Sequence, residues 1–304
     1  MSHQKILVTG SSGLIGTAVC AVLESRGHAV RRFDIADQKG GFGDILVPAD
    51  LDAAMAGCTG VVHLAAVSRV IWGERDPEKC RQTNVVGTRN IIDRLVSSDP
   101  RPWLIFGSSR EVYGQGRVLP VGEGDPLRPL NHYARSKVEA EQAVAQAARA
   151  GLRASVLRFS TVYGAVADHA DRVIPGFCRA AIDDRPLRVD GATNSLDITH
   201  VADVADCISD VVTCIAEGGS LRPMHLATGR ATSLSDLAHA VIDLAGSQSE
   251  VIAAAPRDFD VTNFVGDPAV AEAQIGWCPK ISLETGLRKL ISQLREKDTA
   301  GVGG

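Results

Sequence analysis

The first half of the chain alternates short apolar runs with longer segments in which apolar residues recur every three or four positions. Apolar runs rich in β-branched residues are typical of buried parallel strands, and the three-to-four spacing is typical of helices that cover a sheet. The runs predict strands at residues 5–9, 29–33, 60–66, 103–106 and 152–159. The segments between them predict helices at residues 17–26, 77–96 and 133–150. This alternation predicts an α/β fold with a doubly wound, Rossmann-like parallel sheet.

Some segments depart from this alternation. Residues 35–50 are rich in glycine, which favours a loop rather than a full helix in the second crossover. After about residue 165 the pattern becomes mixed, and short strands are expected at residues 186–190 and 224–227. These strands should belong to a smaller region that covers the first sheet.

The change of pattern divides the chain into two parts. We predict a first domain of residues 1–165 and a smaller C-terminal region of residues 166–297. Part of residues 196–210 is expected to return to the first domain. A last helix is expected at residues 283–297, followed by a flexible tail at residues 298–304.

Composition and charge favour a globular enzyme over a protein that binds nucleic acid or a membrane. The chain has 304 residues, of which 45% are hydrophobic, enough for a large core. Its net charge is −4 with Lys and Arg dispersed, which leaves no electrostatic footprint for nucleic acid or an anionic membrane. No apolar stretch reaches the length of a membrane span, and the first strand begins at Lys5, too early to follow a secretory signal. The chain is therefore expected to be cytoplasmic.

The cysteines and histidines do not indicate a disulfide framework or a metal site. The seven cysteines are scattered, odd in number and free of CxxC spacing, so buried reduced thiols are expected. His63, His132 and His200 lack the spacing that a second metal ligand requires. No metal site is predicted.

Glycines follow the first predicted strand at a spacing that indicates a phosphate-binding turn. Gly10, Gly13 and Gly16 occur in Thr-Gly-Ser-Ser-Gly-Leu-Ile-Gly, directly before a predicted helix. Strand, glycine turn and helix in this order let backbone N–H groups approach a pyrophosphate, and the helix N-terminus adds further donors. The spacing is GxxGxxG rather than GxGxxG, and a glycine turn by itself is often only a turn.

An acidic residue at the end of the second strand supports a dinucleotide and favours NAD over NADP. Asp34 lies 18 residues after Gly16, where a carboxylate accepts hydrogen bonds from the hydroxyls of the adenosine ribose. The same carboxylate would repel the 2′-phosphate of NADP, and the residues after it are not a basic pair. Arg31 and Arg32 precede the acid and keep NADP as the less favoured alternative.

A tyrosine and a lysine indicate proton transfer beside this cofactor. Tyr133 and Lys137 are four residues apart, and residues at this spacing share one face of a helix. An ammonium held there lowers the pKa of the phenol, so that Tyr133 can accept a proton near neutral pH. The spacing also occurs on ordinary amphipathic helices, but Ser109 adds weight. A hydroxyl at the carboxyl end of its strand lies in the crevice where doubly wound sheets bind ligands.

These motifs together resemble the extended short-chain dehydrogenase/reductase family, the NAD-dependent epimerases and dehydratases of nucleotide sugars. The resemblance covers most of the chain and includes further segments at residues 43–45, 63–66, 84–88, 112–114, 158–164, 275–279 and 283–287. It implies that Ser109 is the catalytic hydroxyl, Tyr133 the acid/base and Lys137 its partner. Family members commonly dimerise through the helices expected at residues 77–96 and 133–150, so a homodimer is expected.

The resemblance also implies which residues bind NAD. They belong to the glycine turn, to the ends of the strands and to the helices beside them. They are Gly10, Ser12, Gly13, Leu14, Ile15, Gly16, Asp34, Asp44, Ile45, Leu64, Ala65, Ala66, Asn84, Ser108, Tyr133, Lys137 and Phe159.

The implied reaction begins with hydride transfer from a sugar carbinol to NAD, while Tyr133 removes the hydroxyl proton and Ser109 hydrogen-bonds the oxygen. The leading interpretation is a nucleotide-sugar epimerase, in which the keto sugar turns over and takes the hydride back on its other face. A dehydratase and an NAD-dependent dehydrogenase of a sugar-like alcohol are alternatives. A non-catalytic NAD-sensing protein is the alternative of another class, which the intact set of Ser109, Tyr133 and Lys137 disfavours.

The residues after Ser109 depart from the dehydratase pattern. The family's 4,6-dehydratases carry Thr-Asp-Glu where this chain has Ser109, Arg110 and Glu111. Glu111 remains a candidate catalytic base, or a ligand of a substrate hydroxyl, but Arg110 stays protonated and is a poor proton donor. A pair of Arg110 and Glu111 that is simply solvated at a loop is the alternative.

A second departure concerns the nucleotide diphosphate. Leu196 stands where the family has an arginine that meets this group, which weakens the prediction of a nucleotide sugar. Arg188, Arg222 and Arg257 remain as candidate phosphate ligands, and Arg257 is the best match. The candidates for substrate binding are Ser68, Ser109, Arg110, Arg188 and Arg257. Trp72, in the loop near Ser68, either touches substrate or packs beneath that loop.

Overall fold

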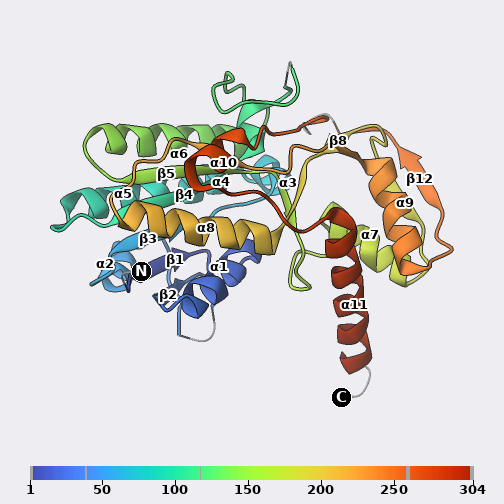
Figure 1. The fold of residues 1–304 in the computed structure, drawn as a ribbon, viewed down its shortest axis with the longest axis horizontal. Helices are drawn as coiled ribbons and strands as arrows, with labels where there is room; N and C mark the ends of the chain where they lie inside the picture. Colours follow the sequence, from blue (N-terminus) through green and yellow to red (C-terminus); the bar gives the residue numbers. More distant parts are fainter. Residues whose placement is uncertain (1–2, 38–39, 117, 258–260, 302–304) are drawn as a thin grey trace.

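A six-stranded parallel sheet lies at the centre of the structure, a computed structural model that describes residues 3–37, 40–116, 118–257 and 261–301 (Figure 1). The strand order is β10-β5-β4-β3-β1-β2, and every neighbouring pair is parallel. The strands are β1 (Lys5–Thr9), β2 (Ala29–Phe33), β3 (Gly60–His63), β4 (Trp103–Ser109), β5 (Ala154–Phe159) and β10 (Met224–Leu226). Since β2 and β3 lie on opposite sides of β1, the winding reverses there, and a ligand crevice is expected outside the carboxyl end of β1.

Helices cover both faces of this sheet. One face is covered by α1 (Leu14–Ser25), α8 (Val201–Ala216) and α10 (Ala269–Ile275), which share a core cluster with Ile6 and Val8. The other is covered by α2 (Pro48–Met55), α5 (Gly87–Ser97) and α6 (His132–Arg149), which share a cluster with Leu7. Successive side chains of β1 therefore point to opposite faces, as expected for a strand buried on both sides. The predicted doubly wound α/β fold is confirmed.

A smaller cap lies beside the carboxyl edge of the sheet (Figure 1). Its helices are α7 (Val173–Ile182), α9 (Leu234–Ala245) and α11 (Leu283–Gly301), which enclose a separate apolar cluster with β7. Short two-stranded sheets complete the cap or join it to the main sheet: β7 (Leu187–Asp190) with β12 (Val251–Ala254), β8 (Ser195–Leu196) with β11 (Thr232–Ser233), and β6 (Thr161–Tyr163) with β9 (Ile198–His200).

Several predicted elements differ in place or length. The strand expected at residues 224–227 is not part of the cap: β10 is the edge strand of the main sheet, because it pairs with β5. The second crossover contains the eight-residue helix α2, which begins at Pro48, a residue suited to the first helical position. Strand β3 ends at His63, and β4 continues to Ser109. The division at residue 165 stays a prediction.

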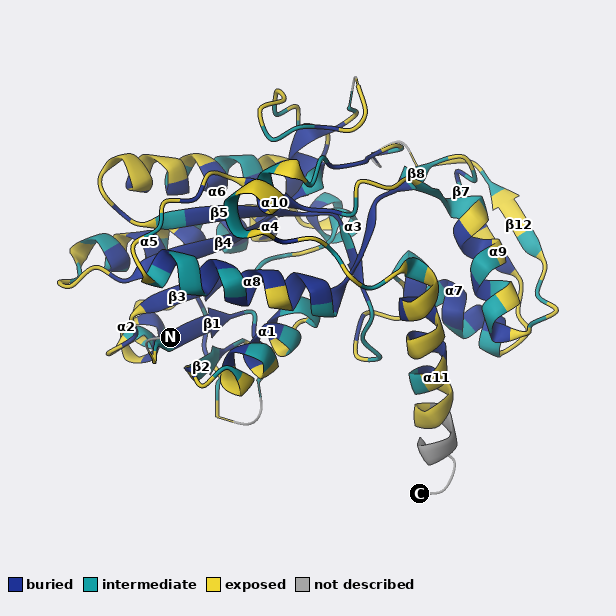
Figure 2. Cartoon of the chain, in the orientation of Figure 1, coloured by how far each residue is buried: buried dark blue, intermediate teal, exposed yellow. Residues whose placement is uncertain are grey.

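The last helix is longer than predicted. Helix α11 continues to Gly301, so the first part of the tail expected at residues 298–304 is helical. Residues 302–304 lie outside the described residues. Figure 2 shows the exposed and intermediate residues of α11 on the side that faces away from the cap.

The helix predicted at residues 77–96 contains a wider turn. It consists of α4 (Pro77–Arg81), a π-helical segment (Gln82–Val86) and α5 in direct succession. The π-helical turn carries Asn84, which is almost fully buried. Such turns inside α-helices are frequent at functional sites, because they displace one side chain from the regular helical positions.

Candidate active site

In the turn after β1, Gly10 and Gly16 have no space for a Cβ atom. Gly10 has a φ of +70°, and a Cβ there would lie 2.6 Å from the backbone nitrogen of Ala65. A Cβ on Gly16 would lie 2.0 Å from the carbonyl oxygen of Gly10. Gly13 precedes α1, and no side chain caps that helix N-terminus. The uncapped N–H groups fit a pyrophosphate, as the sequence predicts.

Asp34 lies beside this turn. Its carboxylate accepts hydrogen bonds from the N–H groups of Ser12, at 3.0 Å, and Ala36, at 2.8 Å. Leu14 and Ile15 follow the turn and pack partly buried against the core beneath α1. The turn and the acid therefore meet at the end of β1, which is where an adenosine ribose and its diphosphate would have to be held together.

The next predicted cofactor residues line the neighbouring strand ends. Asp44 is half-buried, and its carboxylate accepts the N–H of Leu46 at 2.8 Å. The Ile45 side chain is buried in the core, where a Cβ on Gly87 would lie 2.4 Å from its Cδ1. Residues 64–66 follow β3 and are half-buried.

Asn84 joins the loop after β3 to helix α6. Its Oδ1 accepts the N–H of Val67 at 2.8 Å, and its Nδ2 donates to the carbonyl of Val67 and to the Ser136 hydroxyl, at 3.1 and 2.8 Å. A buried amide with these partners is satisfied, so Asn84 positions two parts of the site relative to each other.

Ser108 and Phe159 lie at the carboxyl ends of β4 and β5, where the sequence predicts them. The Ser108 hydroxyl donates to Glu141 of α6 at 2.5 Å. Its side chain therefore ties β4 to α6. A Cβ on Gly107 would lie 2.9 Å from atoms of both Phe159 and Leu64, so these side chains flank that glycine.

The predicted catalytic hydroxyls meet between β4 and α6. Ser109 ends β4, and Tyr133 lies in the first turn of α6. Burial raises the pKa of Tyr133 to about 12, whereas the Ser109 hydroxyl acts in the opposite direction. The sequence predicts a lowered pKa, which is wrong for this structure because desolvation of the phenol outweighs the neighbouring charges.

Lys137 lies one turn after Tyr133 and is also buried. Its ammonium donates to the carbonyl of Gly107 at 2.8 Å and lies 4.9 Å from the ring centre of Phe106. Burial lowers the pKa of Lys137 to about 8, although the charge of Glu141 acts to raise it. The ammonium is thus held against the strand that carries Ser109.

Arg110 and Glu111 form a buried pair rather than a solvated one. Their side chains are 13% and 9% exposed, and the guanidinium lies 3.1 Å from the carboxylate. Asn131, the N-cap of α6, donates to the second oxygen of Glu111 at 3.2 Å. Both carboxylate oxygens thus have partners. The charge of Glu111 contributes to raising the pKa of Tyr133.

Most of the candidate phosphate ligands lie away from these groups. Arg188 lies on β7 in a two-stranded sheet of the cap, where its exposed guanidinium pairs with Asp190 at 2.8 Å. Arg222 precedes β10 and so lies at the amino edge of the sheet. Arg257 is exposed three residues after β12, and residues 258–260 of its motif lie outside the described residues. Leu196 packs in the apolar core of the cap.

Two other residues of the predicted substrate loops can be placed. Ser68 is exposed in the loop after β3. Trp72 lies in α3 (Val70–Arg75), where its ring meets His169 edge-on at 4.9 Å. This contact agrees with the packing alternative for Trp72, and contact with substrate stays a prediction.

Sequence reasoning missed Asn131, whose amide donates to Glu111. Asn131 was detectable, because an asparagine before a helical pattern is a common N-cap and its Oδ1 does accept the N–H of Ala134.

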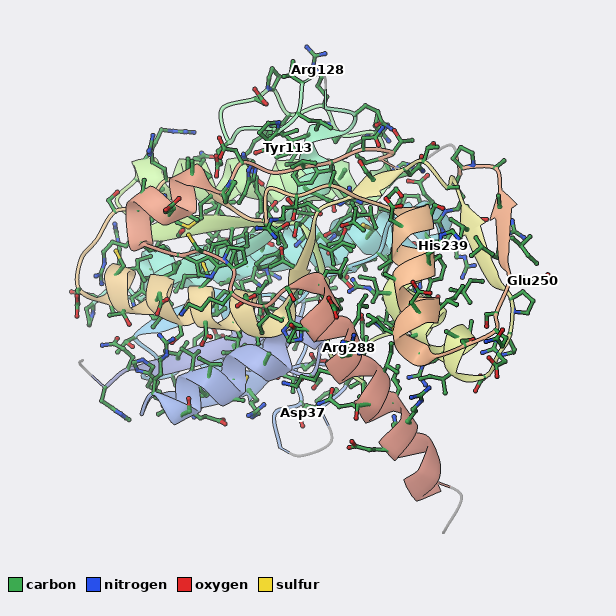
Figure 3. The ribbon with its side chains drawn as sticks, turned by 45° about the vertical axis from the view of Figure 1, so that its right-hand side comes forward. Asp37, Tyr113, Arg128, His239, Glu250 and Arg288 are labelled. Carbon is green, nitrogen blue, oxygen red and sulfur yellow. The ribbon has the colours of Figure 1, made fainter. Side chains whose placement is uncertain are left out.

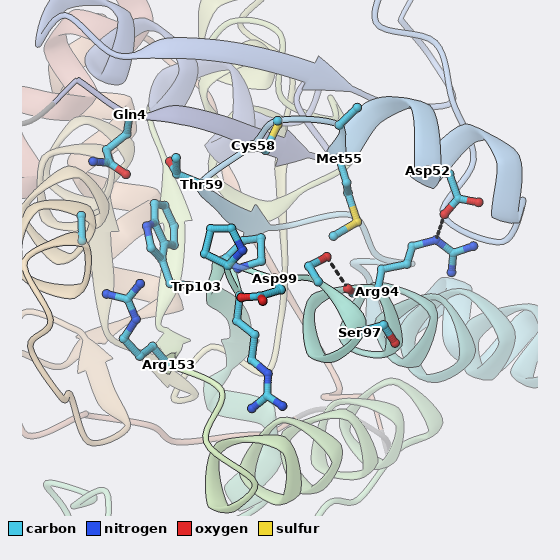
Figure 4. Close-up of a pocket in the computed structure, with 17 residues that line it drawn as sticks. Gln4, Asp52, Met55, Cys58, Thr59, Arg94, Ser97, Asp99, Trp103 and Arg153 are labelled. Carbon is cyan, nitrogen blue, oxygen red and sulfur yellow. Dashed lines mark hydrogen bonds and ion pairs between the residues drawn. The ribbon is translucent and has the colours of Figure 1, made fainter.

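A hollow of about 720 Å³ lies at the opposite edge of the sheet (Figure 4). It is lined by the residues that precede β3 and β4, and its Arg94 is already bonded to Asp52 at 2.6 Å. It is therefore separate from the site at the carboxyl edge. Within the described residues, no three His, Cys, Asp or Glu side chains gather as a metal ion would require, and no helix is long and apolar enough to span a membrane.

The chain matches a known enzyme family over most of its length. The profile of the NAD dependent epimerase/dehydratase family matches residues 6–226. The chain belongs to this family. The extended short-chain dehydrogenase/reductase type that the sequence predicts is thereby confirmed.

Known epimerases are similar to the chain over nearly its whole length. UDP-glucose 4-epimerase of Rhizobium leguminosarum bv. trifolii is 28% identical and covers 95% of this chain and 96% of its own. UDP-glucose 4-epimerase of Thermotoga maritima, solved with UDP-glucose, has a TM-score of 0.90 at 26% identity over 96% of this chain and 99% of that chain. The Brucella ovis enzyme, solved with NAD, has a TM-score of 0.87 at 29% identity over 96% and 98%.

Proposed function

We propose that the chain is an NAD-dependent nucleotide-sugar epimerase that inverts C4 of a UDP-hexose. The observation that carries this proposal is the placement of Ser109 and Tyr133 together at the carboxyl edge of a sheet whose glycine turn fits a dinucleotide. The full-length similarity to UDP-glucose 4-epimerases supports the uridine nucleotide and the position of inversion.

The residues have distinct roles in this reaction. When bound, NAD supplies a nicotinamide that accepts a hydride from the sugar carbon and returns it. Tyr133 accepts the proton of the sugar hydroxyl, while Ser109 donates a hydrogen bond to the same oxygen as it becomes a carbonyl. Lys137 lies one helical turn after Tyr133, and its ammonium is fixed by the carbonyl of Gly107. For the return step, Tyr133 gives its proton back to the carbonyl oxygen.

Glu111 supports dehydration as a second candidate function. It is buried beside Tyr133, where a carboxylate can remove a proton from a sugar carbon next to the carbonyl. Its partners Arg110 and Asn131 hold it as an acceptor and supply no acid for the departing hydroxyl. The epimerase is therefore the better supported function.

A panel of UDP-, dTDP-, GDP- and CDP-sugars tests these functions. Products are identified by mass spectrometry and by NMR of the C4 proton while NADH absorbance is followed. Epimerisation gives an unchanged mass, an inverted C4 and no accumulating NADH. Loss of one water would instead indicate the dehydratase, and accumulating NADH the dehydrogenase. A protein inactive towards the whole panel would contradict a nucleotide-sugar substrate.

Tyr133→Phe separates an enzyme from an NAD-sensing protein. The variant keeps the ring that packs in the site but loses the group that carries the proton, so we expect the rate to fall by about 100-fold or more. NAD affinity, measured by fluorescence titration, should change little. Unchanged turnover would show that another group carries the proton.

The oligomeric state and location are further proposals. We propose a homodimer formed through the surface of α5 and α6, as the family resemblance implies, and size-exclusion chromatography with light scattering tests it. We also propose a cytoplasmic location, which agrees with seven unpaired cysteines.

A further inference from the structure

Phe42 is an exposed aromatic residue in a chain that buries most of its other described aromatic side chains. It is 70% exposed, whereas Phe33, Phe106 and Phe264 are at most 3% exposed. An exposed phenyl ring lacks the favourable free energy that its burial would contribute. Single exposed apolar residues are common on protein surfaces, so the place of this one in the fold decides whether it has a role. That place is the end of β2, beside Asp34.

Backbone hydrogen bonds pair Phe42 with Asp34. The N–H of Asp34 donates to the carbonyl of Gly41 at 2.9 Å, and the N–H of Gly43 donates to the carbonyl of Asp34 at 3.2 Å. These two bonds form a parallel bridge in which Asp34 and Phe42 are the partners. Partner residues in a parallel ladder direct their side chains to the same face. Phe42 is therefore on the same side of the backbone as the Asp34 carboxylate.

The neighbours of this pair face the opposite way. Phe33 precedes Asp34 and is buried in the core shared with α2 and α5. A Cβ on Gly43 would lie 2.2 Å from Cε2 of Phe33, so Gly43 lies against that ring. The Asp34 carboxylate, in contrast, accepts the N–H of Ser12 in the glycine turn at 3.0 Å. The face that Asp34 shares with Phe42 is thus the face of the glycine turn.

The covalent structure of NAD decides which part of the cofactor reaches this face. With the pyrophosphate at the glycine turn, Asp34 is placed to accept hydrogen bonds from the hydroxyls of the adenosine ribose. The base and the phosphate are joined to opposite sides of that ribose, so adenine is directed away from the turn. Asp44, which the family resemblance places beside adenine, follows Phe42 by two residues. The flat face of a base packs well on an aromatic ring.

We propose that Phe42 is a further cofactor-binding residue, whose ring packs against the adenine of NAD. The inference rests on the NAD-binding part of the proposed function and is independent of the sugar. Contact with adenine removes the phenyl ring from water, which gives a reason for an exposed aromatic side chain at the edge of the cofactor site.

Calorimetric titration of the cofactor-free protein tests this contact. Phe42→Ala removes the ring, and we expect the Kd for NAD to rise by about tenfold. ADP-ribose contains the same adenosine but no nicotinamide, so its Kd should rise by the same factor. Phe42→Tyr keeps an aromatic ring and should bind both ligands as the wild type does. Because Phe42 is exposed, Phe42→Ala should leave urea unfolding of the cofactor-free protein unchanged, which separates a lost contact from a lost fold.

Ile252→Ala is the matched control. Ile252 is 50% exposed on β12 in the cap, so this change also removes an exposed apolar side chain but away from the turn. It should leave both dissociation constants unchanged. An unchanged Kd in Phe42→Ala, or an equal rise in Ile252→Ala, would contradict the contact. A rise for NAD without a rise for ADP-ribose would assign Phe42 to the nicotinamide half and overturn the proposal.

Phe42→Trp reports the contact directly. The emission of this variant minus that of the wild type gives the signal of the introduced indole, since both proteins share Trp72, Trp103 and Trp277. Adenine packed on that indole should quench the difference signal when ADP-ribose is added. A difference signal that saturating ADP-ribose leaves unchanged would overturn the proposal. No sugar enters these measurements, so a protein that shows the quenching but converts no sugar would contradict the proposed epimerisation and still support this contact.

Discussion

At the scale of single residues, positions without a side chain are as informative as reactive ones. Gly10 adopts a positive φ and also lies against the backbone of Ala65. Two constraints therefore act on one residue: the dihedral angle and the space between β1 and β3. Only a residue without a Cβ meets both, which is why the turn can approach a phosphate closely.

Gly10→Ala should lose both stability and NAD. The added methyl group would collide with backbone that cannot move as a flexible side chain does, so we expect a loss of about 2–4 kcal/mol in unfolding free energy. NAD affinity should fall at least tenfold, measured by fluorescence titration. Gly27→Ala is the matched control: Gly27 has a φ of +84°, but a Cβ there meets nothing within 4 Å. Gly27→Ala should lower the free energy of unfolding by about 1 kcal/mol and leave NAD affinity unchanged. Equal effects of the two variants would contradict the close-approach argument.

At the scale of elements, helix α6 carries functional residues at successive turns of one face. Tyr133, Lys137 and Glu141 are spaced by four residues, and all are buried. Glu141 accepts two hydrogen bonds from Arg158 of β5, at 3.0 and 2.7 Å, in addition to the bond from Ser108 of β4. These bonds fix α6 to both strands, and so fix Tyr133 relative to Ser109.

Glu141→Gln should weaken this attachment. It leaves the buried Arg158 guanidinium without its counter-charge, so we expect a loss of about 3 kcal/mol in unfolding free energy, measured by urea denaturation. Turnover should fall as well, because Tyr133 and Ser109 are held less accurately. The matched control is Glu284→Gln, which breaks an exposed pair with Arg288 on α11 (Figure 3). Glu284→Gln should lower the free energy of unfolding by less than about 0.5 kcal/mol. Similar losses in both variants would rule out a special role for the Glu141 pair.

At the scale of the whole molecule, a buried polar network joins the two halves of the chain. Tyr113 lies inward, beneath the loop whose tip carries Arg128 (Figure 3). Its hydroxyl accepts a hydrogen bond from Arg158 at 2.5 Å and lies 2.6 Å from Nε2 of His225 on β10. His225 also lies near Glu123, at 3.6 Å, and contacts the carbonyl of Asp267. These hydrogen bonds hold β10, which comes from the second half of the chain, at the edge of a sheet whose other strands come from the first half.

His225 should make folding stability sensitive to acid. Burial lowers its pKa to about 4, below the usual value for histidine. Below about pH 6.5 the unfolded chain therefore binds a proton that the folded chain does not, and stability falls as the pH falls towards 4, by about 1.4 kcal/mol per unit.

The measurement compares urea unfolding of the wild type and His225→Gln at several pH values between 7 and 4.5. The glutamine does not titrate, so the difference in stability between the two proteins should shrink as the pH falls. Parallel pH profiles would show that His225 is already protonated in the folded state.

Local patterns predicted the fold well where the deciding contacts are close in sequence. The runs at residues 5–9 and 29–33 match β1 and β2 in their bounds, because β-branched content and flanking turns mark both ends. A strand was correctly predicted at residues 224–227, but its assignment to the cap was wrong because a short apolar strand has no local sign of its neighbour. Its pairing with β5, more than 60 residues earlier, decides its place.

For the site, spacing identified the residues that act together within one element. Tyr133 and Lys137 were detectable because one helical turn separates them. The buried state of the Arg110–Glu111 pair was not, because it depends on how other segments pack around these side chains. The same holds for the pKa of Tyr133, which depends on desolvation by segments from several parts of the chain.

By itself, the sequence determined the doubly wound sheet, the glycine turn, the acid that favours NAD and the helix face that carries Tyr133 and Lys137. Each follows from hydrophobic periodicity or from dihedral and spacing requirements within a short segment. Only the tertiary structure decided that β10 joins the main sheet, that Asn84 joins the loop after β3 to α6, and that Arg110 and Glu111 form a buried pair. These outcomes depend on contacts between residues that are far apart in the sequence. The pattern of residues along the chain does not show which of them come close together in the fold.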